Sequence, residues 1–219
     1  AAKKGDRKAS AKLGMMEFER ENFAAAKKHL TAANDKKFGE PIAISEIGLL
    51  EEKSELDPKA YSGDLVSALE KSIKDFPSSP ESVDRRISLS EKYASAGNKT
   101  KRDAVLKDAI RFAQELIKNP DRLEGKDYAP PDLWVSIANA NTKLGDVSAA
   151  KVAWLSAIKD YRGLMKSENE RGYSLELAYC TWKSGDVAGA EAIYKRFDAL
   201  YPAEFTFFHA HANMDYELG

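Results

Sequence analysis

Cysteine is almost absent from this sequence of 219 residues, because Cys180 is the only one. A single cysteine excludes an intramolecular disulfide and a cage of several thiolates around a metal ion. Long apolar runs are also missing, since no stretch approaches the roughly 18 apolar residues that a membrane-spanning helix needs. We therefore expect no membrane insertion of this chain, and its compartment stays open: cytoplasmic, or periplasmic if a signal peptide was removed.

An excess of either charge is missing as well. The chain has 34 basic and 35 acidic residues, for a formal net charge of −1. Divided at Tyr128, the two parts carry net charges of +2 and −3. Nucleic-acid-binding domains show a strong basic bias, so nucleic acid is not an expected partner. A content of 43% hydrophobic and 32% charged residues instead favours a folded, soluble, mostly helical protein.

The motifs of catalysis and cofactor binding are absent too. There is no glycine-rich phosphate loop, no nucleophile elbow and no paired-histidine zinc helix. His209 and His211 are two residues apart, so on a helix they point about 200° away from each other and cannot chelate one ion together. Cys180 has no base nearby in a helical segment, which predicts a small buried thiol. We expect a chain that is not an enzyme and that needs no metal or cofactor.

Two further polar features are expected to be structural. His211 aligns with Ile137 and Leu177 at a core position, which predicts a packed, hydrogen-bonded histidine. The N-terminal basic cluster has no aromatic residues beside it and is expected to be a frayed terminus rather than a nucleic-acid arm. That cluster consists of Lys3, Lys4, Arg7 and Lys8.

What the sequence does contain is a repeat. Residues 133–161 align with residues 173–202. In this alignment Gly145-Asp146-Val147 corresponds to Gly185-Asp186-Val187. A third, partial copy ends at Gly219, 34 residues after Gly185. Each glycine permits the positive φ of a helix C-terminal cap, and the aspartate after it can cap the next helix. Each copy is therefore predicted to be a helical hairpin.

The remaining positions of the copies fit two packed antiparallel helices. Ala138 and Ala150 are small where the helices must cross, as are their equivalents Ala178 and Ala190. Trp154 and Tyr194 occupy equivalent positions in the two copies, and both are large enough to fill the space against the next hairpin. Burying each ring is worth roughly 2 to 3 kcal/mol.

Earlier parts of the chain match the repeat less well. Residues 10–35 read as a hairpin in which Glu21-Asn22 replaces Gly-Asp and Phe23 replaces Val147. Residues 41–56 and 65–76 are predicted to form a degenerate pair of helices, because Asp57-Pro58 is expected to stop the first helix. A third pair begins near Pro80, with its second helix at 101–118 and an insertion around Asn98 to Thr100. Residues 119–131 are expected to be a surface loop or a hinge.

At these residues the chain resembles the tetratricopeptide repeat (TPR), a helix-turn-helix unit of about 34 residues. The resemblance implies an all-α, right-handed superhelix, which is an α-α solenoid of antiparallel hairpins. Its predicted parts are N-terminal hairpins at 1–128, of which the first is a fair repeat and the others are degenerate, and two strong repeats with a terminal helix at 129–219. The matching residues are Trp134, Ala138, Gly145, Ala150, Trp154 and Ala157, and then Leu177, Ala178, Gly185, Ala190, Tyr194, Phe197 and Pro202.

The resemblance also implies a function, because the first helices of such hairpins line a concave groove that grips peptides or partner proteins. Aromatic, amide and basic groups on this face suit an extended peptide of some acidic character. Alternatively, Tyr179 and Trp182 only pack against the neighbouring hairpin. A carboxylate-clamping role is rejected because Val135, Glu176 and Ala210 stand where basic or amide groups are needed. The groove candidates are Asn139, Lys143, Leu175, Tyr179, Trp182, Lys183, His209, Asn213 and Tyr216.

The sequence thus predicts a non-catalytic module that binds a peptide or protein segment and assembles a complex. One alternative is that the chain is the helical arm of a larger enzyme or cell-envelope machine, because the last hairpin is unfinished at Gly219. Another is a self-associating scaffold, since Phe205, Phe208 and Ala212 form an uncovered apolar face that could make a homo-oligomer through the terminal helix.

Overall fold

The computed structural model describes residues 4–124, 128–167, 172–202 and 205–218. Within these ranges the chain forms eleven α-helices and two short 3-10 helices, and no strand occurs. The predicted all-α fold class is therefore confirmed. The chain divides into two compact units, Ala1–Val105 and Leu106–Gly219. The boundary that the sequence places after residue 128 stays a prediction.

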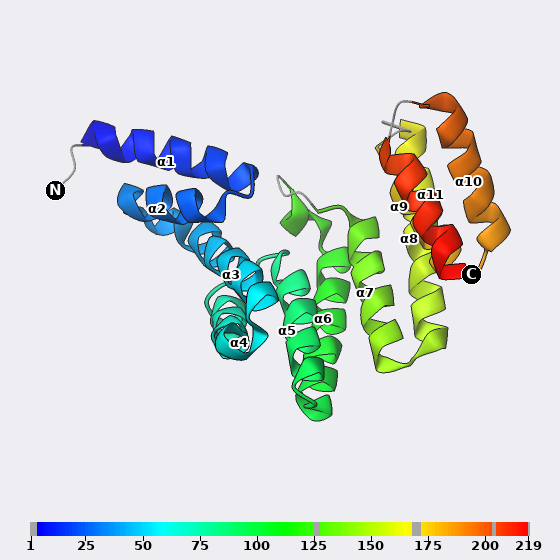
Figure 1. Cartoon of the computed structure of the whole chain (residues 1–219). Helices are drawn as coiled ribbons and strands as arrows, with labels where there is room; N and C mark the ends of the chain where they lie inside the picture. Colours follow the sequence, from blue (N-terminus) through cyan, green and yellow to red (C-terminus); the bar gives the residue numbers. More distant parts are fainter. Residues whose placement is uncertain (1–3, 125–127, 168–171, 203–204, 219) are drawn as a thin grey trace. The chain divides into compact units, whose positions relative to one another are not determined.

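The first unit is built of helices that each pack against the next helix along the chain. Contacts join α1 to α2, α2 to α3, α3 to α4 and α4 to α5 (Figure 1). A 3-10 helix at Lys36–Phe38 links the first hairpin to the second, and α6 (Lys99–Lys118) continues from this unit into the next. The bounds are Lys4–Glu19 for α1, Phe23–Ala33 for α2, Gly39–Leu56 for α3, Pro58–Asp75 for α4 and Ser82–Ser95 for α5.

The second unit repeats this arrangement. Contacts join α7 to α8, α8 to α9, α9 to α10 and α10 to α11, and α11 also reaches back to α9 (Figure 1). The predicted hairpins of neighbouring helices are thus confirmed. A 3-10 helix at Pro120–Leu123 precedes them. The bounds are Pro130–Leu144 for α7, Val147–Ser167 for α8, Ser174–Lys183 for α9, Val187–Leu200 for α10 and Phe205–Leu218 for α11.

The two strong turns have the predicted caps. Gly145 and Gly185 have φ values of 81° and 100°, a region that favours glycine because a side chain there meets its own backbone. Asp146 Oδ1 accepts a hydrogen bond from the Ala149 N–H at 2.9 Å. Asp186 Oδ1 accepts one from the Gly189 N–H, also at 2.9 Å. Each turn therefore ends one helix and starts the next within two or three residues.

The turn of the first hairpin has the same form with different residues. Glu21 takes the positive-φ position at 58°. Asn22 caps α2, because its side-chain oxygen accepts a hydrogen bond from the Ala25 N–H at 3.4 Å. Phe23 opens α2 as Val147 opens α8, so the predicted equivalence of these positions is confirmed.

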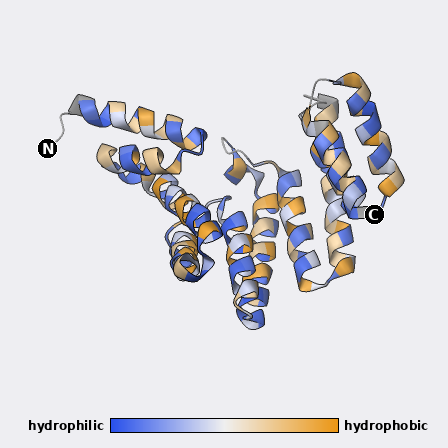
Figure 2. Cartoon of the chain, viewed as in Figure 1, coloured by the Kyte–Doolittle hydropathy of each residue, from blue (hydrophilic) through white to orange (hydrophobic). Residues whose placement is uncertain are grey.

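The core follows the repeat positions that the sequence predicted. Hydrophobic and hydrophilic residues are mixed along the helices (Figure 2), and the buried ones recur at equivalent places. The helices of the first hairpin approach so closely at Gly14 that an added Cβ would lie 2.7 Å from the Leu30 side chain. The equivalent buried sets are Ala26, Ala150 and Ala190 at the crossing, Leu30, Trp154 and Tyr194 beside it, and Ala33, Ala157 and Phe197 one turn further.

The fourth helix differs from its prediction. It covers Pro58–Asp75 rather than a short segment from residue 65. Asp57 caps it, because its Oδ1 atom accepts a hydrogen bond from the Ala60 N–H at 3.1 Å, and Pro58 is the first helical residue. A proline at that position loses no helical hydrogen bond. Asp57-Pro58 therefore ends α3 and begins α4 at once.

The predicted insertion around Asn98 to Thr100 is wrong. Gly97 has a φ of 71°, Asn98 accepts a hydrogen bond from the Lys101 N–H at 3.1 Å, and α6 begins at Lys99. The turn is therefore as tight as the later ones. Leu106, which is fully buried, follows Gly97 at the distance at which Trp154 follows Gly145. The misalignment arose because Arg102 replaces the small residue expected at the crossing.

The frayed N-terminus is also a wrong prediction, since α1 begins at Lys4 and includes Arg7 and Lys8. Lys3 lies outside the described residues. The first helix therefore starts before residue 10, where the sequence placed the start of the hairpin. The added segment contains alanine and lysine, which are good helix formers, and no proline.

Candidate peptide-binding groove

A cavity of about 460 Å³ opens in the second unit, lined chiefly by α9 and α11, with Val135 reaching it from α7. α7 and α9 are the first helices of two successive hairpins, and α11 is the terminal helix that follows them; these are the elements from which the repeat pattern predicts a groove. Two tyrosines from the second helices, Tyr161 of α8 and Tyr194 of α10, also reach it. Five predicted site residues line it together: Leu175, Tyr179, Trp182, His209 and Asn213.

Three aromatic rings form a connected wall beside the cavity. The Tyr179 ring lies edge-on to Trp154, with 5.7 Å between centroids, and edge-on to Trp182 at 6.0 Å. Tyr179 and Trp182 are both half-buried and both line the cavity. Tyr179 thus packs against the preceding hairpin and presents part of its ring to the groove, which combines the two alternatives that the sequence left open.

Lys183 lies beside this wall and is paired within the chain. Its Nζ atom is 3.6 Å from the centroid of the Trp182 ring and 2.8 Å from Oε2 of Glu217. The pair joins α9 to α11. Because Glu217 already neutralises this ammonium group, Lys183 is a weak candidate for attracting an acidic peptide.

The charges at the cavity differ from the expected basic groove. Glu176 and Glu217 both line it, and no lysine or arginine is among its lining residues within the described ranges. Lys143 is exposed on α7 and is not part of the lining. The acidic peptide that the sequence suggested therefore finds little complementary charge here.

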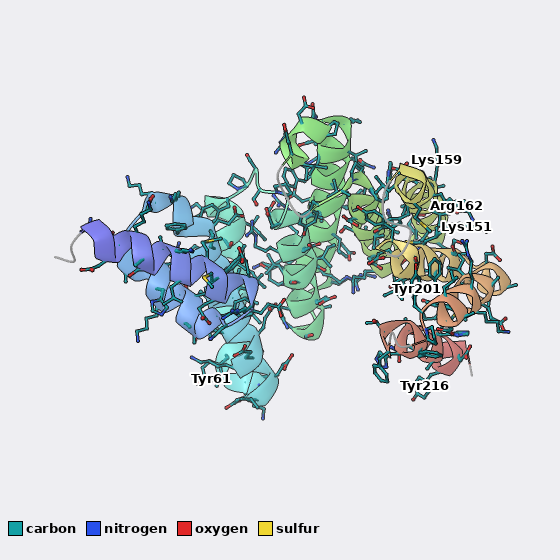
Figure 3. The ribbon with its side chains drawn as sticks, turned by 90° about the horizontal axis from the view of Figure 1, so that it is seen from above. Tyr61, Lys151, Lys159, Arg162, Tyr201 and Tyr216 are labelled. Atoms are coloured by element: carbon teal, nitrogen blue, oxygen red, sulfur yellow. The ribbon has the colours of Figure 1, made fainter. Side chains whose placement is uncertain are left out.

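Three exposed basic residues of this unit lie together elsewhere. Lys151, Lys159 and Arg162 are all exposed on α8. In Figure 3 they lie at the opposite edge of the second unit from Tyr216 of α11. The cavity and the basic face of α8 are thus separate surfaces.

Asp132 connects the start of α7 to α8 by a hydrogen bond to a residue that lines the cavity. Its Oδ1 atom accepts a hydrogen bond from the Tyr161 hydroxyl at 2.6 Å, and its Oδ2 atom accepts one from the Ala129 N–H at 2.8 Å. Burial and the bond to the carboxylate raise the pKa of Tyr161. The hydroxyl therefore stays protonated and holds the two helices in one register.

Cys180 is fully buried, as predicted for a structural thiol. Burial, together with the nearby carboxylates Glu176 and Asp132, raises the pKa of Cys180 to about 12. A thiol with this pKa is a poor nucleophile near neutral pH, because almost none of it is thiolate.

The two histidines of α11 have different environments. His211 stacks on Tyr194 with centroids 5.2 Å apart, and its Nδ1 atom lies 3.0 Å from Oδ2 of Asp198. The predicted packed, hydrogen-bonded histidine is confirmed. His209 is exposed, faces the cavity and stacks on Phe205 at 5.9 Å. Among the described residues no group of three or more potential ligands could hold a metal ion.

Four predicted site residues are not among those that line the cavity: Lys183 lies beside it, and the other three lie on α7 and α11. Asn139 is half-buried on α7, Lys143 is exposed on the same helix, and Tyr216 is 89% exposed on α11. Figure 3 shows Tyr216 at the outer edge of that helix.

Eight of the thirteen described lining residues were not predicted as site residues, among them Thr206 and Glu217. Thr206 stands in the first turn of α11, ahead of the residues aligned with the repeat. Glu217 could have been found, since it follows Lys183 by 34 residues, which is one repeat period. Equivalent positions of adjacent repeats are neighbours in a stack, so a lysine and a glutamate one period apart indicate an ion pair.

None of the described helices combines the length and the apolar character that crossing a bilayer requires.

Comparisons with known proteins give similar structures but no similar sequences. No protein-family model matches the chain, and no curated protein matches it. The chain is similar to the structure of a kinesin light chain from Podosopora anserina with nearly identical TPR-like repeats, at 13% identity and a TM-score of 0.48, with 92% of this chain and 97% of that chain covered. It is also similar to the assembly chaperone of RpL4 (Acl4), at 17% identity and a TM-score of 0.47, covering 98% and 83%.

Proposed function

We propose that this chain is a non-catalytic interaction module that holds an extended protein segment in the groove of α7, α9 and α11. The observation that carries the proposal is the shared cavity, because two successive hairpins and the terminal helix contribute apolar and aromatic side chains and the amide of Asn213 to one hollow. A stack that served only to pack its own core would have no need to leave these groups around an open space.

The size and the lining of the cavity suit such a ligand. Its volume of about 460 Å³ falls within the range of roughly 300 to 1,000 Å³ that is typical of ligand sites. Tyrosine and tryptophan are enriched at interfaces because their rings give large contact areas with few rotatable bonds. Asn213 and His209 are exposed at the same place and can bond the backbone amides of an extended chain.

Affinity capture from the native extract tests the proposal when two variants are compared. Thr206→Arg/Asn213→Arg fills the cavity from exposed positions, so its core packing is preserved. Ser148→Arg/Ala192→Arg adds the same charge at exposed positions of α8 and α10 outside the lining. We expect a protein that wild type and the control variant retain and that the groove variant loses. Identical captured sets from all three proteins would show that the groove is not the binding site.

A second candidate function is self-association through α11. The specific observation is the apolar edge of this helix, where Phe205 is 78% and Phe208 is 44% exposed. Sedimentation of wild type and of Phe205→Ser/Phe208→Ser over a range of concentrations tests it. A dimer that forms with wild type alone supports this role, and a monomer at every concentration removes it.

A further inference from the structure

The cavity has an uncompensated negative charge among the residues that the structure describes. Glu176 projects from α9 and Glu217 from α11, and both line the hollow. Lys183 balances Glu217. Within the described ranges no ion pair joins Glu176 to a basic side chain, and the groove therefore retains one carboxylate in excess.

The surroundings of Glu176 favour the arrival of a cation. Loss of solvation at this place raises the pKa of the Glu176 carboxyl, and the negative charge of Asp132 raises it in addition. Glu176 remains exposed at its surface, and a partly desolvated carboxylate near a like charge is stabilised by a positive group more than a fully solvated one.

Lys183 shows how a cation is held at this wall. Its ammonium group lies 3.6 Å from the centroid of the Trp182 ring while Glu217 accepts from it at 2.8 Å. The same group is 5.6 Å from the Tyr179 centroid. An aromatic face and a carboxylate together bind an ammonium or guanidinium group, because the ring quadrupole and the anion both attract it.

We propose that the groove selects a protein segment in which lysine or arginine alternates with apolar residues, an inference that rests on the binding function proposed above. The apolar side chains of the bound segment enter between Leu175 and the two tyrosines that reach the cavity from the second helices, Tyr161 and Tyr194. The basic side chain lies against the aromatic wall with its charge between Glu176 and Glu217. In the free protein the Lys183 ammonium group occupies part of this binding position, and the arriving cation displaces it from Glu217.

An acidic segment is disfavoured by the same geometry. Its carboxylates would face Glu176, and Lys183, the basic residue beside the aromatic wall, is already paired. A neutral segment would gain the apolar contacts but not the charge interaction. The three ligand classes therefore have a predicted order of affinity: basic, then neutral, then acidic.

Fluorescence anisotropy with matched peptides tests this order. The probes are labelled Gly-Leu-X repeats of one length in which X is lysine, glutamine or glutamate. We expect the lysine peptide to bind about tenfold more tightly than the glutamine peptide, and added salt to weaken only the lysine peptide. Equal binding of the lysine and glutamine peptides, or tighter binding of the glutamate peptide, overturns the inference.

Charge variants locate the interaction. Glu176→Gln/Glu217→Gln is expected to weaken the lysine peptide about tenfold and to leave the glutamine peptide unchanged. Glu115→Gln/Glu191→Gln changes the net charge equally at two carboxylates that pair on α6 and α10, and it should leave both peptides unchanged. Lys183→Gln should strengthen the lysine peptide about threefold, because the internal competitor is removed. A loss of affinity in the control variant as well would show a general charge effect instead.

The test separates this inference from the function on which it rests. The groove variant Thr206→Arg/Asn213→Arg should abolish binding of whichever peptide binds. If a glutamine or glutamate peptide is bound best and this variant abolishes it, the groove binds protein segments and the basic preference is wrong. If the groove variant binds the lysine peptide as wild type does, the proposed binding site itself is wrong.

Discussion

Glu21 has the left-handed backbone conformation that Gly185 has in a later turn, with φ values of 58° and 100°. Both residues stand between the two helices of a hairpin, and each is followed by a residue whose side chain caps the second helix. Glycine adopts this conformation without a steric penalty, whereas glutamate does not. The first hairpin therefore carries local backbone strain that the later hairpins avoid.

Replacing this residue should stabilise the protein. We expect Glu21→Gly to raise the free energy of unfolding by about 1 kcal/mol, because the strain is removed at an exposed position. Urea denaturation measures the change. The reciprocal control, Gly145→Ala, should lower stability by about 1 kcal/mol. An unchanged or lower stability of Glu21→Gly would contradict the equivalence of the two turns.

Gly14 should tolerate no side chain. A Cβ there would lie 2.7 Å from the Leu30 side chain and 2.9 Å from the Leu30 backbone nitrogen. Since backbone cannot move aside cheaply, we expect Gly14→Ala to cost about 1 to 3 kcal/mol, measured by thermal unfolding followed by circular dichroism. Gly63→Ala on α4 is the matched control, because nothing lies within 4 Å of its Cβ position, and it should be neutral or stabilising. Equal melting temperatures for the two variants would refute the close approach of α1 and α2.

The Tyr161 hydroxyl should stabilise the second unit. Tyr161→Phe removes its hydrogen bond to Asp132 from a buried place, so we expect a loss of about 1 to 2 kcal/mol in calorimetric unfolding. Tyr216→Phe removes the same group from a residue that is 89% exposed and should change nothing measurable. If the two variants unfold alike, the bond between α7 and α8 contributes no net stability.

Stability should fall at alkaline pH. Burial raises the pKa of Cys180 from 9.0 to about 12, and burial likewise raises the pKa of Tyr194 from 10.0 to about 12. Between pH 9 and 12 the unfolded chain loses these protons while the folded chain keeps them. The folded state then binds more protons, so the free energy of unfolding decreases as pH rises.

Cys180→Ala provides the check on that pH dependence. The variant loses packing at every pH, but its stability should decline less steeply just above pH 9, because the thiol no longer contributes. A thiol reagent added to native wild type near pH 8 should react about a thousandfold more slowly than with the unfolded protein. Rapid labelling of the native thiol would contradict its burial.

Periodicity made the hairpins of the second unit predictable. Gly145-Asp146 and Gly185-Asp186 combine a positive-φ residue with a cap, and few other structures need both in that order. Where the residue types change but the geometry stays, prediction fails. Asp57-Pro58 reads equally well as a stop or a start, and the structure shows that it is both. Arg102 hid the register of α6 because it is large where the repeat is small.

The charge of the candidate site was harder to predict than its position. Helical spacing placed Tyr179 and Trp182 on one face of their helix and Asn213 on the inward face of the last helix, and the structure brings all three to one cavity. Spacing alone does not tell whether a lysine is free, because pairing depends on the neighbouring hairpin. The bond between Lys183 and Glu217 is one reason why we propose a basic rather than an acidic ligand, and it follows from packing between repeats rather than from the local sequence.

The packing of each helix against its neighbours in the chain has a consequence for folding. Within each described unit the principal contacts join helices that are one or two places apart in the sequence. Contact order is therefore low, and closing the loops between partners costs little entropy. Each hairpin can form as soon as its own residues and those of the next helix have left the ribosome. The array should thus assemble during synthesis and open from its ends in native-state hydrogen exchange, with α11 exchanging before α8.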